Sequence, residues 1–206
     1  MDKFVVRLPR SLPGEASRPK ERATYKQMTI HDLRGVVVVE DVLRLKAQLE
    51  LNNQATEVLL SALHEISGKQ PSVKVLQEIK IGRSVRRLSN HSDPQVAILA
   101  RDICASWKSF IRERRSLPMI EVRSDAKTEC LRQSARKLIA EALAIVETSL
   151  IVESIEREVY HQSHRILNSS YRRTIRKLVF RLRAEDATAE SVRLGNISSL
   201  LSSSRH

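Results

Sequence analysis

The amino-acid sequence predicts an all-α protein, and three observations support this fold class. Aromatic residues make up 3% of the 206 residues, and the chain contains five glycines. Few aromatics and few glycines argue against a β-sandwich or a nucleotide-binding α/β fold. Apolar residues recur at helical spacings of three and four in several segments. No apolar run approaches the roughly 20 residues of a membrane-spanning helix, so we expect no membrane partner.

The first helical block extends from about residue 38 to residue 114. One stripe in it is expected to be buried: Leu59, Leu63 and Ile66. Asn52 or Asn53 is the expected N-cap of this helix, because a short side-chain acceptor can take a free backbone N–H. Gly68 and Pro71, in "GKQPS", are expected to end that helix and to open the next short segment.

A longer helix in the same block has the best-marked start in the sequence. Asp93 is the expected N-cap, and Pro94 takes the first helical position, where its missing N–H costs nothing. The apolar residues that follow share one face: Val96, Leu99, Ala100, Ile103, Trp107 and Phe110. We therefore interpret Trp107, the only tryptophan, as a core residue rather than a base-stacking platform.

A second helical block is expected over residues 124–196, after a linker at residues 115–123 that contains Pro118. Its apolar residues form three stripes: Leu131, Ala135, Leu138, Ala142 and Ile145; Val152, Ile155 and Val159; Ile175, Leu178, Val179 and Leu182. Three such amphipathic helices can enclose one small core as a bundle. Residues 1–27 are predicted to be a disordered basic arm, and the Ser-rich residues 197–206 a flexible tail.

The chain is strongly basic, with a net charge of +12 at pH 7. Basic side chains outnumber acidic ones by seven to three in residues 1–27, twelve to nine in residues 38–114 and fourteen to ten in residues 124–206. This distributed excess of positive charge favours anionic partners, either nucleic acid or acidic peptides. A basic surface that is only solvated is the alternative.

Two stretches in the first block carry a resemblance to a known family. "IKIGRSVRRLSNH", followed by "VAILARDICASWKSF", resembles the N-terminal helical domain of transcription elongation factor TFIIS, also called the leucine–tryptophan domain. The defining positions are Ile81, Gly82, Val85, Leu88, His91, Leu99, Ala100, Trp107 and Lys108. The resemblance covers residues 38–114. It implies a bundle of four or five helices and a nuclear protein associated with RNA polymerase II transcription elongation.

The second block is similar to the TFIIS central domain, a three-helix bundle, through "TECLRQSARKLIAEAL", "IEREVY" and "YRRTIRKLVFRLR". Two departures from that family matter. Arg181 stands where TFIIS-like proteins place Asn before a Leu-Lys pair. The chain also lacks the C-terminal cysteine pair of the TFIIS zinc ribbon, so we expect no stimulation of transcript cleavage.

The basic helix in the first signature is the first candidate site. Ile81, Val85 and Leu88 are spaced to pack inward, which leaves the basic side chains outside. In related domains this region binds disordered segments of elongation or chromatin factors that carry aromatic and acidic residues. The resemblance assigns that role to Lys80, Gly82, Arg83, Arg87 and Lys108. Gly82 would let a partner approach closely, and a solvated arginine surface is the alternative.

The last stripe leaves a basic helix face as a second candidate site. Its residues are Arg172, Arg173, Arg176, Lys177, Phe180 and Arg181. An aromatic ring among arginines could grip a phosphate backbone or an acidic surface, so this face is assigned to RNA polymerase II or nucleic acid. The alternative is that Phe180 packs against the first helix of the block.

No catalytic residues, metal or cofactor are expected. The sequence contains no nucleophile motif and no Gly-rich phosphate loop. His161, His164 and Glu158 have a spacing that metal sites use, but no second ligand cluster completes a tetrahedron. We therefore predict a monomeric, non-enzymatic interaction protein, with direct nucleic-acid binding through the arm and the second basic face as the alternative function.

Overall fold

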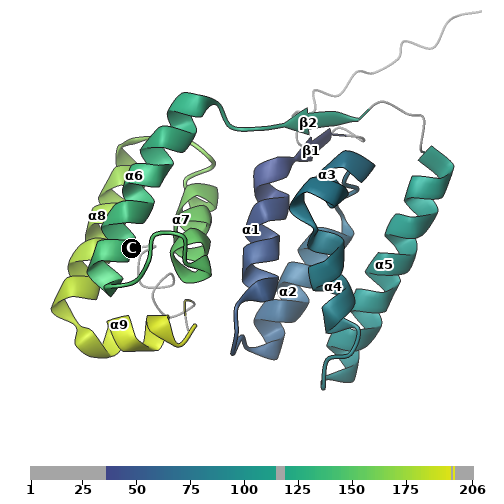
Figure 1. Ribbon diagram of the computed structural model, residues 1–206, viewed down its shortest axis with the longest axis horizontal. Coiled ribbons are helices and arrows are strands. Elements are labelled where there is room, and N and C mark those ends of the chain that lie inside the picture. Colours follow the sequence, from purple (N-terminus) through teal and green to yellow (C-terminus); the bar gives the residue numbers. More distant parts are fainter. Residues whose placement is uncertain (1–35, 115–118, 196, 198–206) are drawn as a thin grey trace, which may run out of the picture.

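The computed structural model describes residues 36–114, 119–195 and 197, and these form two helical bundles that lie side by side (Figure 1). The first bundle contains α1 (Val39–Glu50), α2 (Thr56–Ser67), α3 (Val73–Ile79), α4 (Ile81–Leu88) and α5 (Pro94–Arg114). The second contains α6 (Ala126–Leu143), α7 (Leu150–Gln162), α8 (Ser169–Ala184) and α9 (Asp186–Arg193). The predicted all-helical class is confirmed. The arm predicted over residues 1–27 lies outside the described residues.

The first core gathers apolar side chains from every helix of its bundle. The stripe predicted from Leu59, Leu63 and Ile66 is buried, and so are Val96, Ala100 and Ile103 on α5. Trp107 is 5% exposed, which confirms its assignment to the core. Its ring nitrogen Nε1 donates a 3.1 Å hydrogen bond to the backbone oxygen of Lys69, just after α2. The indole therefore fixes α5 against the end of α2.

The two predicted N-caps have different outcomes. Asp93 caps α5, because its Oδ1 accepts a 2.8 Å hydrogen bond from the backbone N–H of Gln95. The prediction of Asn52 or Asn53 as the cap of α2 is wrong, since α2 begins at Thr56 after Ala55. Asn53 instead adopts a left-handed φ of 57° in the turn between α1 and α2. Asn tolerates that conformation better than most residues, so the turn uses it before α2 begins.

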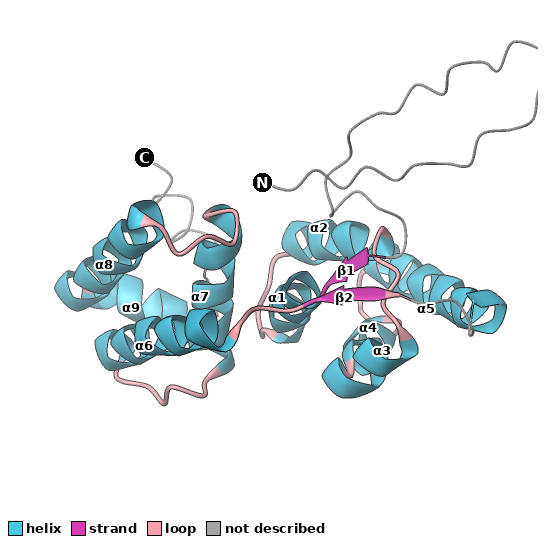
Figure 2. Ribbon diagram, turned by 90° about the horizontal axis from the view of Figure 1, so that it is seen from above, coloured by secondary structure: helices cyan, strands magenta, loops and turns pink. Residues whose placement is uncertain are grey.

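A short parallel strand pair connects the segment before the first helix of the first bundle with the segment after its last helix (Figure 2). β1 (Val36–Val38) pairs with β2 (Ile120–Val122), with Val37 opposite Glu121. The segment expected to be only a linker, residues 115–123, thus contains a strand. Both strands consist largely of β-branched residues, which favour extended backbone. Because the strands are parallel, the chain leaves both at the same end of the pair, into α1 after Val38 and towards α6 after Val122.

The second core contains residues of all four helices, so the expected three-helix bundle gains α9. Val152, Ile155 and Val159 on α7 and Ile175, Leu178 and Leu182 on α8 are buried, as predicted. Ala189 and Val192 on α9 and Ile197 complete the same core. The expected tail at residues 197–206 therefore begins with a buried side chain, and residues 198–206 lie outside the described residues. No helix of the described ranges is long and apolar enough to cross a membrane.

The apolar face predicted for α6 is wrong by about one position. Leu131 and Leu138 are 51% and 42% exposed, whereas Arg132 is fully buried beside Ala135, Ile139 and Leu143. Arg132 can be buried because its guanidinium donates two hydrogen bonds of 2.8 and 2.7 Å to the carboxylate of Glu156. The guanidinium also lies 4.2 Å from the centre of the Tyr160 ring. A buried, fully paired arginine has thus replaced the leucines on the inner face.

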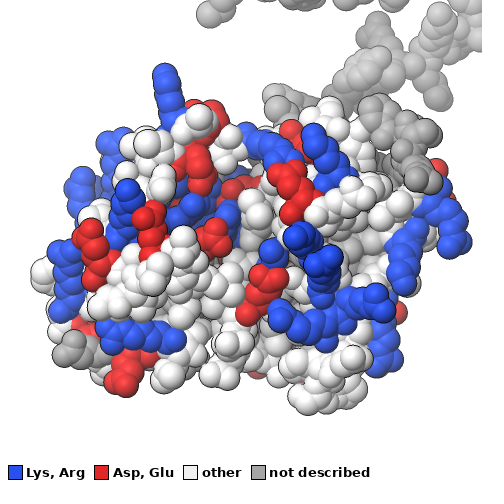
Figure 3. All heavy atoms as spheres, viewed as in Figure 1, with Lys and Arg blue, Asp and Glu red and all other residues white. Residues whose placement is uncertain are grey.

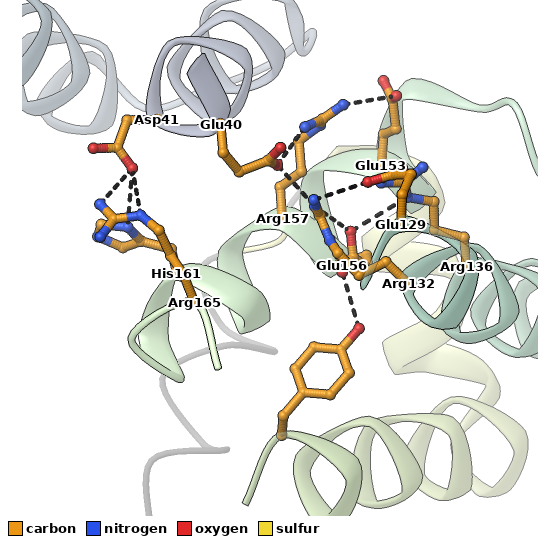
Figure 4. A network of polar contacts seen from close by, with 11 residues as sticks. Glu40, Asp41, Glu129, Arg132, Arg136, Glu153, Glu156, Arg157, His161 and Arg165 are labelled. Carbon is orange, nitrogen blue, oxygen red and sulfur yellow. Dashed lines mark hydrogen bonds and ion pairs between the residues drawn. The ribbon is translucent and has the colours of Figure 1, made fainter. Parts of the chain in front are cut away.

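Charged side chains also connect the two bundles, where α1 faces α7 (Figure 4). On α1, Glu40 pairs with Arg132 and Arg157, and Asp41 accepts a hydrogen bond from Arg165 Nε at 2.9 Å. Burial raises the pKa of Glu40, but hydrogen bonds from Arg132 and the charge of Arg157 outweigh burial and hold that pKa below 4.5. The carboxylates therefore stay ionised at the junction.

Candidate functional site

Two helices that meet almost without a connection create the predicted basic surface. Lys80 ends α3 and precedes α4 with a left-handed φ of 62°, so the chain turns sharply there. Ile81, Val85 and Leu88 on α4 are buried, as predicted. The hydroxyl of Ser84, also buried, donates a 2.6 Å hydrogen bond to Oε1 of Glu50 on α1. These contacts fix the rotation of α4 and leave its basic residues on the outer face.

A groove of about 950 Å³ lies between this outer face and α5, and we call it the α4–α5 groove. Its lining residues are Leu76, Gln77, Lys80, Gly82, Arg83, Arg86, Ser89, Asn90, Arg101, Cys104, Ala105, Trp107, Lys108 and Ile111. Figure 3 shows lysine and arginine side chains gathered over α4 and α5 on the face in view. The groove therefore combines an apolar floor with a cationic rim.

Four of the five residues predicted for the first site line this groove: Lys80, Gly82, Arg83 and Lys108. Arg87 does not, although it is exposed on the same helix. Sequence reasoning missed Arg86 and Arg101 as lining residues. A helical spacing could have found both, because Arg86 is three residues after Arg83 and Arg101 is seven before Lys108, so each pair shares a helix face.

The cations on the rim of the groove are not neutralised by any carboxylate in the described part of the chain. Among the described residues, no carboxylate forms an ion pair with Lys80, Arg83, Arg86, Arg101 or Lys108. All five are exposed. Gly82 lies between them, and a Cβ built on it meets no atom within 4 Å. The rim is thus open to carboxylates from outside, with space for close approach above Gly82.

The thiol of Cys104 lies in the groove floor and does not provide a reactive site. Burial raises its pKa, and the charges of Lys108 and Arg86 only partly oppose this shift. A thiol with a raised pKa is a poor nucleophile at neutral pH. Cys104 therefore contributes to the apolar floor together with Leu76 and Trp107.

The second predicted site is on α8. Arg172, Arg173 and Arg176 line a hollow of about 400 Å³ with Leu167, Asn168 and Ser169. Phe180 is 73% exposed, so the alternative in which it packs against the first helix of the block is wrong. Arg181 lies 3.8 Å from Glu185 and is only partly exposed. Lys177 is exposed on the same helix but does not line the hollow.

Neither of the two histidines near the end of α7 belongs to a metal-binding cluster of the described residues. His161 Nδ1 lies 3.8 Å from Asp41, and burial, followed by the charge of Arg44, lowers the pKa of His161. His164 follows α7 in a left-handed turn with φ 55°. Within the described ranges, no group of three or more His, Cys, Asp or Glu side chains is placed to hold a metal ion.

The groove lies in a part of the chain that is similar to a known domain. A family model described as the TFIIS helical bundle-like domain of Med26 matches residues 61–111, which include every residue that lines the α4–α5 groove. The chain is also similar to the probable mediator of RNA polymerase II transcription subunit 26a of Arabidopsis thaliana, with 29% identity over 83 residues. That match covers 40% of this chain but 14% of the relative. No solved structure matches the chain.

Proposed function

We propose that this chain is a non-enzymatic nuclear interaction protein of RNA polymerase II transcription, and that its α4–α5 groove docks disordered acidic segments of elongation or chromatin factors. The observation that carries the proposal is the composition of the groove. Exposed cations that form no ion pair with any described carboxylate surround an apolar floor, and both lie in the range similar to the Med26 domain.

The chemistry of the groove selects the partner. An acidic segment is attracted by Lys80, Arg83, Arg86, Arg101 and Lys108, because opposite charges steer the encounter. One apolar or aromatic side chain of the segment would enter the floor beside Leu76 and Ile111 and lose contact with water there. A disordered segment suits such a site, since an apolar anchor and flanking charges can be presented within a few residues.

A matched pair of charge reversals tests the proposal. The probe is a short labelled peptide with one phenylalanine among glutamates and aspartates, and its binding to the full chain is followed by fluorescence anisotropy. Lys80→Glu with Arg83→Glu should weaken binding by about tenfold or more. Lys127→Glu with Lys137→Glu makes the same change in net charge on α6, where both lysines are exposed, and should weaken it much less.

Equal loss in the two double variants would mean that net charge alone attracts the peptide, and the groove assignment would fail. The same variants identify the natural partner. Proteins recovered from nuclear extract by the wild-type chain and by Lys127→Glu with Lys137→Glu, but not by Lys80→Glu with Arg83→Glu, are the candidates for direct docking.

A second candidate function, contact of α8 with nucleic acid, is supported by the exposure of Phe180 beside arginines. Exposed aromatic rings stack on unpaired bases, and arginines bind the phosphates. Phe180→Ala should then weaken binding of a labelled single-stranded RNA, and the affinity should fall steeply as salt increases. An affinity for RNA that Phe180→Ala leaves unchanged would count against this function.

A further inference from the structure

The stripe of leucines that α6 turns outward lines a second groove. Leu131, Ser134, Ala135 and Leu138 on α6 face Leu167, Tyr171, Arg172, Ile175 and Arg176, and together they enclose about 210 Å³. Figures 1 and 2 show α6 and α8 side by side, and the two helices are in direct contact. We call this surface the α6–α8 groove. It is separate from the α4–α5 groove, which is on the other bundle.

The floor of this groove is apolar. Leu131 and Leu138 are two turns apart on one face of α6, and each exposes about half of its side chain. Single exposed leucines are common on protein surfaces, whereas Leu131 and Leu138 lie on one helical stripe and line the same hollow, so one partner segment can cover both. The buried arginine explains their position, since pairing of Arg132 with Glu156 holds the leucine stripe outside.

The rim of the α6–α8 groove is cationic on one side. Arg172 and Arg176 border both this groove and the neighbouring hollow that Arg173 also lines, so the two depressions share part of their lining. Within the described ranges, no carboxylate forms an ion pair with any of these three arginines. An apolar floor therefore lies directly beside three exposed, unneutralised positive charges.

We propose that the α6–α8 groove is a docking site for an acidic segment of a partner protein that carries an aliphatic or aromatic anchor. The anchor covers Leu131, Leu138 and Ile175. Carboxylates of the segment bind Arg172 and Arg176, each of which can offer two parallel N–H donors. This proposal concerns a different surface from the α4–α5 groove and does not depend on the function proposed for that groove.

Charge and shape favour this occupant over the others. Residues 1–27 of this chain have a net charge of +4, so the arginines would repel them. A nucleic acid would satisfy the arginines but not the floor, because the floor is aliphatic and Tyr171, its aromatic residue, is 4% exposed. Base stacking needs an exposed ring. A protein segment with one apolar anchor matches both the floor and the rim.

The test uses the full chain with Lys80→Glu and Arg83→Glu in place, so that the α4–α5 groove does not contribute. The probe is a labelled acidic peptide with a single leucine anchor, followed by anisotropy. Leu131→Gln with Leu138→Gln, and separately Arg172→Glu with Arg176→Glu, should each weaken binding by about tenfold. Ile98→Gln with Val146→Gln is the matched control, since it replaces two exposed apolar side chains outside the groove by the same residue, and it should leave peptide binding unchanged.

Each other outcome overturns the proposal. Loss of binding in the arginine variant but not in the leucine variant would mean simple charge attraction. RNA that binds with the same leucine dependence would assign the groove to nucleic acid. Self-association in sedimentation velocity that the leucine change abolishes would assign it to a second copy of the chain. Circular dichroism spectra of the leucine variant test whether it is folded. The arginine variant tests the same groove through a separate set of side chains.

Discussion

Arg132 Nη2 on α6 donates a 2.8 Å hydrogen bond to Oε1 of Glu40 on α1, and this contact joins the two bundles through a fully buried guanidinium. The same guanidinium pairs with Glu156 inside the second core, and Tyr171 donates a hydrogen bond to Glu156 from α8. Glu40 also binds Arg157 on α7. The junction is thus part of the same charge network that fixes the rotation of α6.

Removal of the charge on Glu40 should destabilise the protein strongly. Glu40→Gln leaves Arg132 and Arg157 buried with less compensation, and the loss of one partner of a buried pair costs about 3 kcal/mol. The free energy of unfolding from urea titration measures this. Glu57→Gln is the control, because Glu57 is exposed in the first turn of α2, and it should change the free energy by less than about 0.5 kcal/mol. If the two substitutions changed the free energy of unfolding equally, the ion pairs of Glu40 would not contribute to stability as proposed.

The junction also predicts a particular response to acid. Burial raises the pKa of Asp41, but hydrogen bonds from Lys69 and Arg165 outweigh burial. In the folded protein the pKa of Asp41 therefore lies below its ordinary value of 3.8, and the pKa of Glu40 lies below its ordinary value of 4.5. Their contribution to stability is therefore complete above those values and is lost as the pH falls through the lower folded values. Glu40→Gln should flatten the fall in stability below pH 4.5, and parallel curves for the two proteins would refute this.

Gly82 should matter for binding but not for folding. A Cβ at this position meets no atom within 4 Å, and glycine inside a helix costs about 1 kcal/mol relative to alanine. Gly82→Leu should therefore leave the free energy of unfolding unchanged or raise it. The substitution should nevertheless weaken binding of the phenylalanine-containing peptide, because the new side chain occupies space at the rim of the α4–α5 groove. Unchanged affinity would show that the peptide does not approach Gly82.

Gly195 has the opposite role. Its φ is +100°, and a Cβ there would lie 2.6 Å from the backbone oxygen of Asn52 in the other bundle. Gly195→Ala should destabilise the protein by about 1–3 kcal/mol, which thermal or urea unfolding can measure. Gly68→Ala is the control, because the nearest atom to a Cβ at that glycine is 3.7 Å away and its φ is negative. If Gly195→Ala were as stable as the control, the two bundles would not be held as closely as the structure places them.

Docking in the α4–α5 groove should be visible through the only tryptophan. Trp107 lines the groove and is 5% exposed, so a bound anchor changes the surroundings of its ring. Titration with the phenylalanine peptide should alter the emission, and the affinity should fall with added salt, because exposed charges about 10 Å apart are screened at 0.1 M. An emission change that Lys80→Glu with Arg83→Glu does not reduce would place the peptide elsewhere.

Periodic and capped segments were predictable because their signals are local. Asp93 before Pro94 marks the start of α5, and the spacing of Leu59, Leu63 and Ile66 identifies the inner face of α2. Part of the cationic rim of the α4–α5 groove could also be predicted, since a helix that buries Ile81, Val85 and Leu88 must present its arginines outward. Helical spacing places Arg86 on the face of Arg83 and Arg101 on the face of Lys108, but only the packing of α4 against α5 shows that the two faces border one groove.

The amino-acid sequence by itself determined the helical class, the inward side of most helices and the excess of positive charge, because these follow from residue types and spacing within one segment. Only the tertiary structure decided which face of α6 is buried, where β1 and β2 pair, and which cations remain unpaired. Those outcomes depend on residues far apart in the chain, such as Glu40, Arg132 and Glu156. Because Arg132 forms ion pairs with both glutamates, its charged side chain can be buried on the inner face of α6, and the leucines of α6 lie on its outer face.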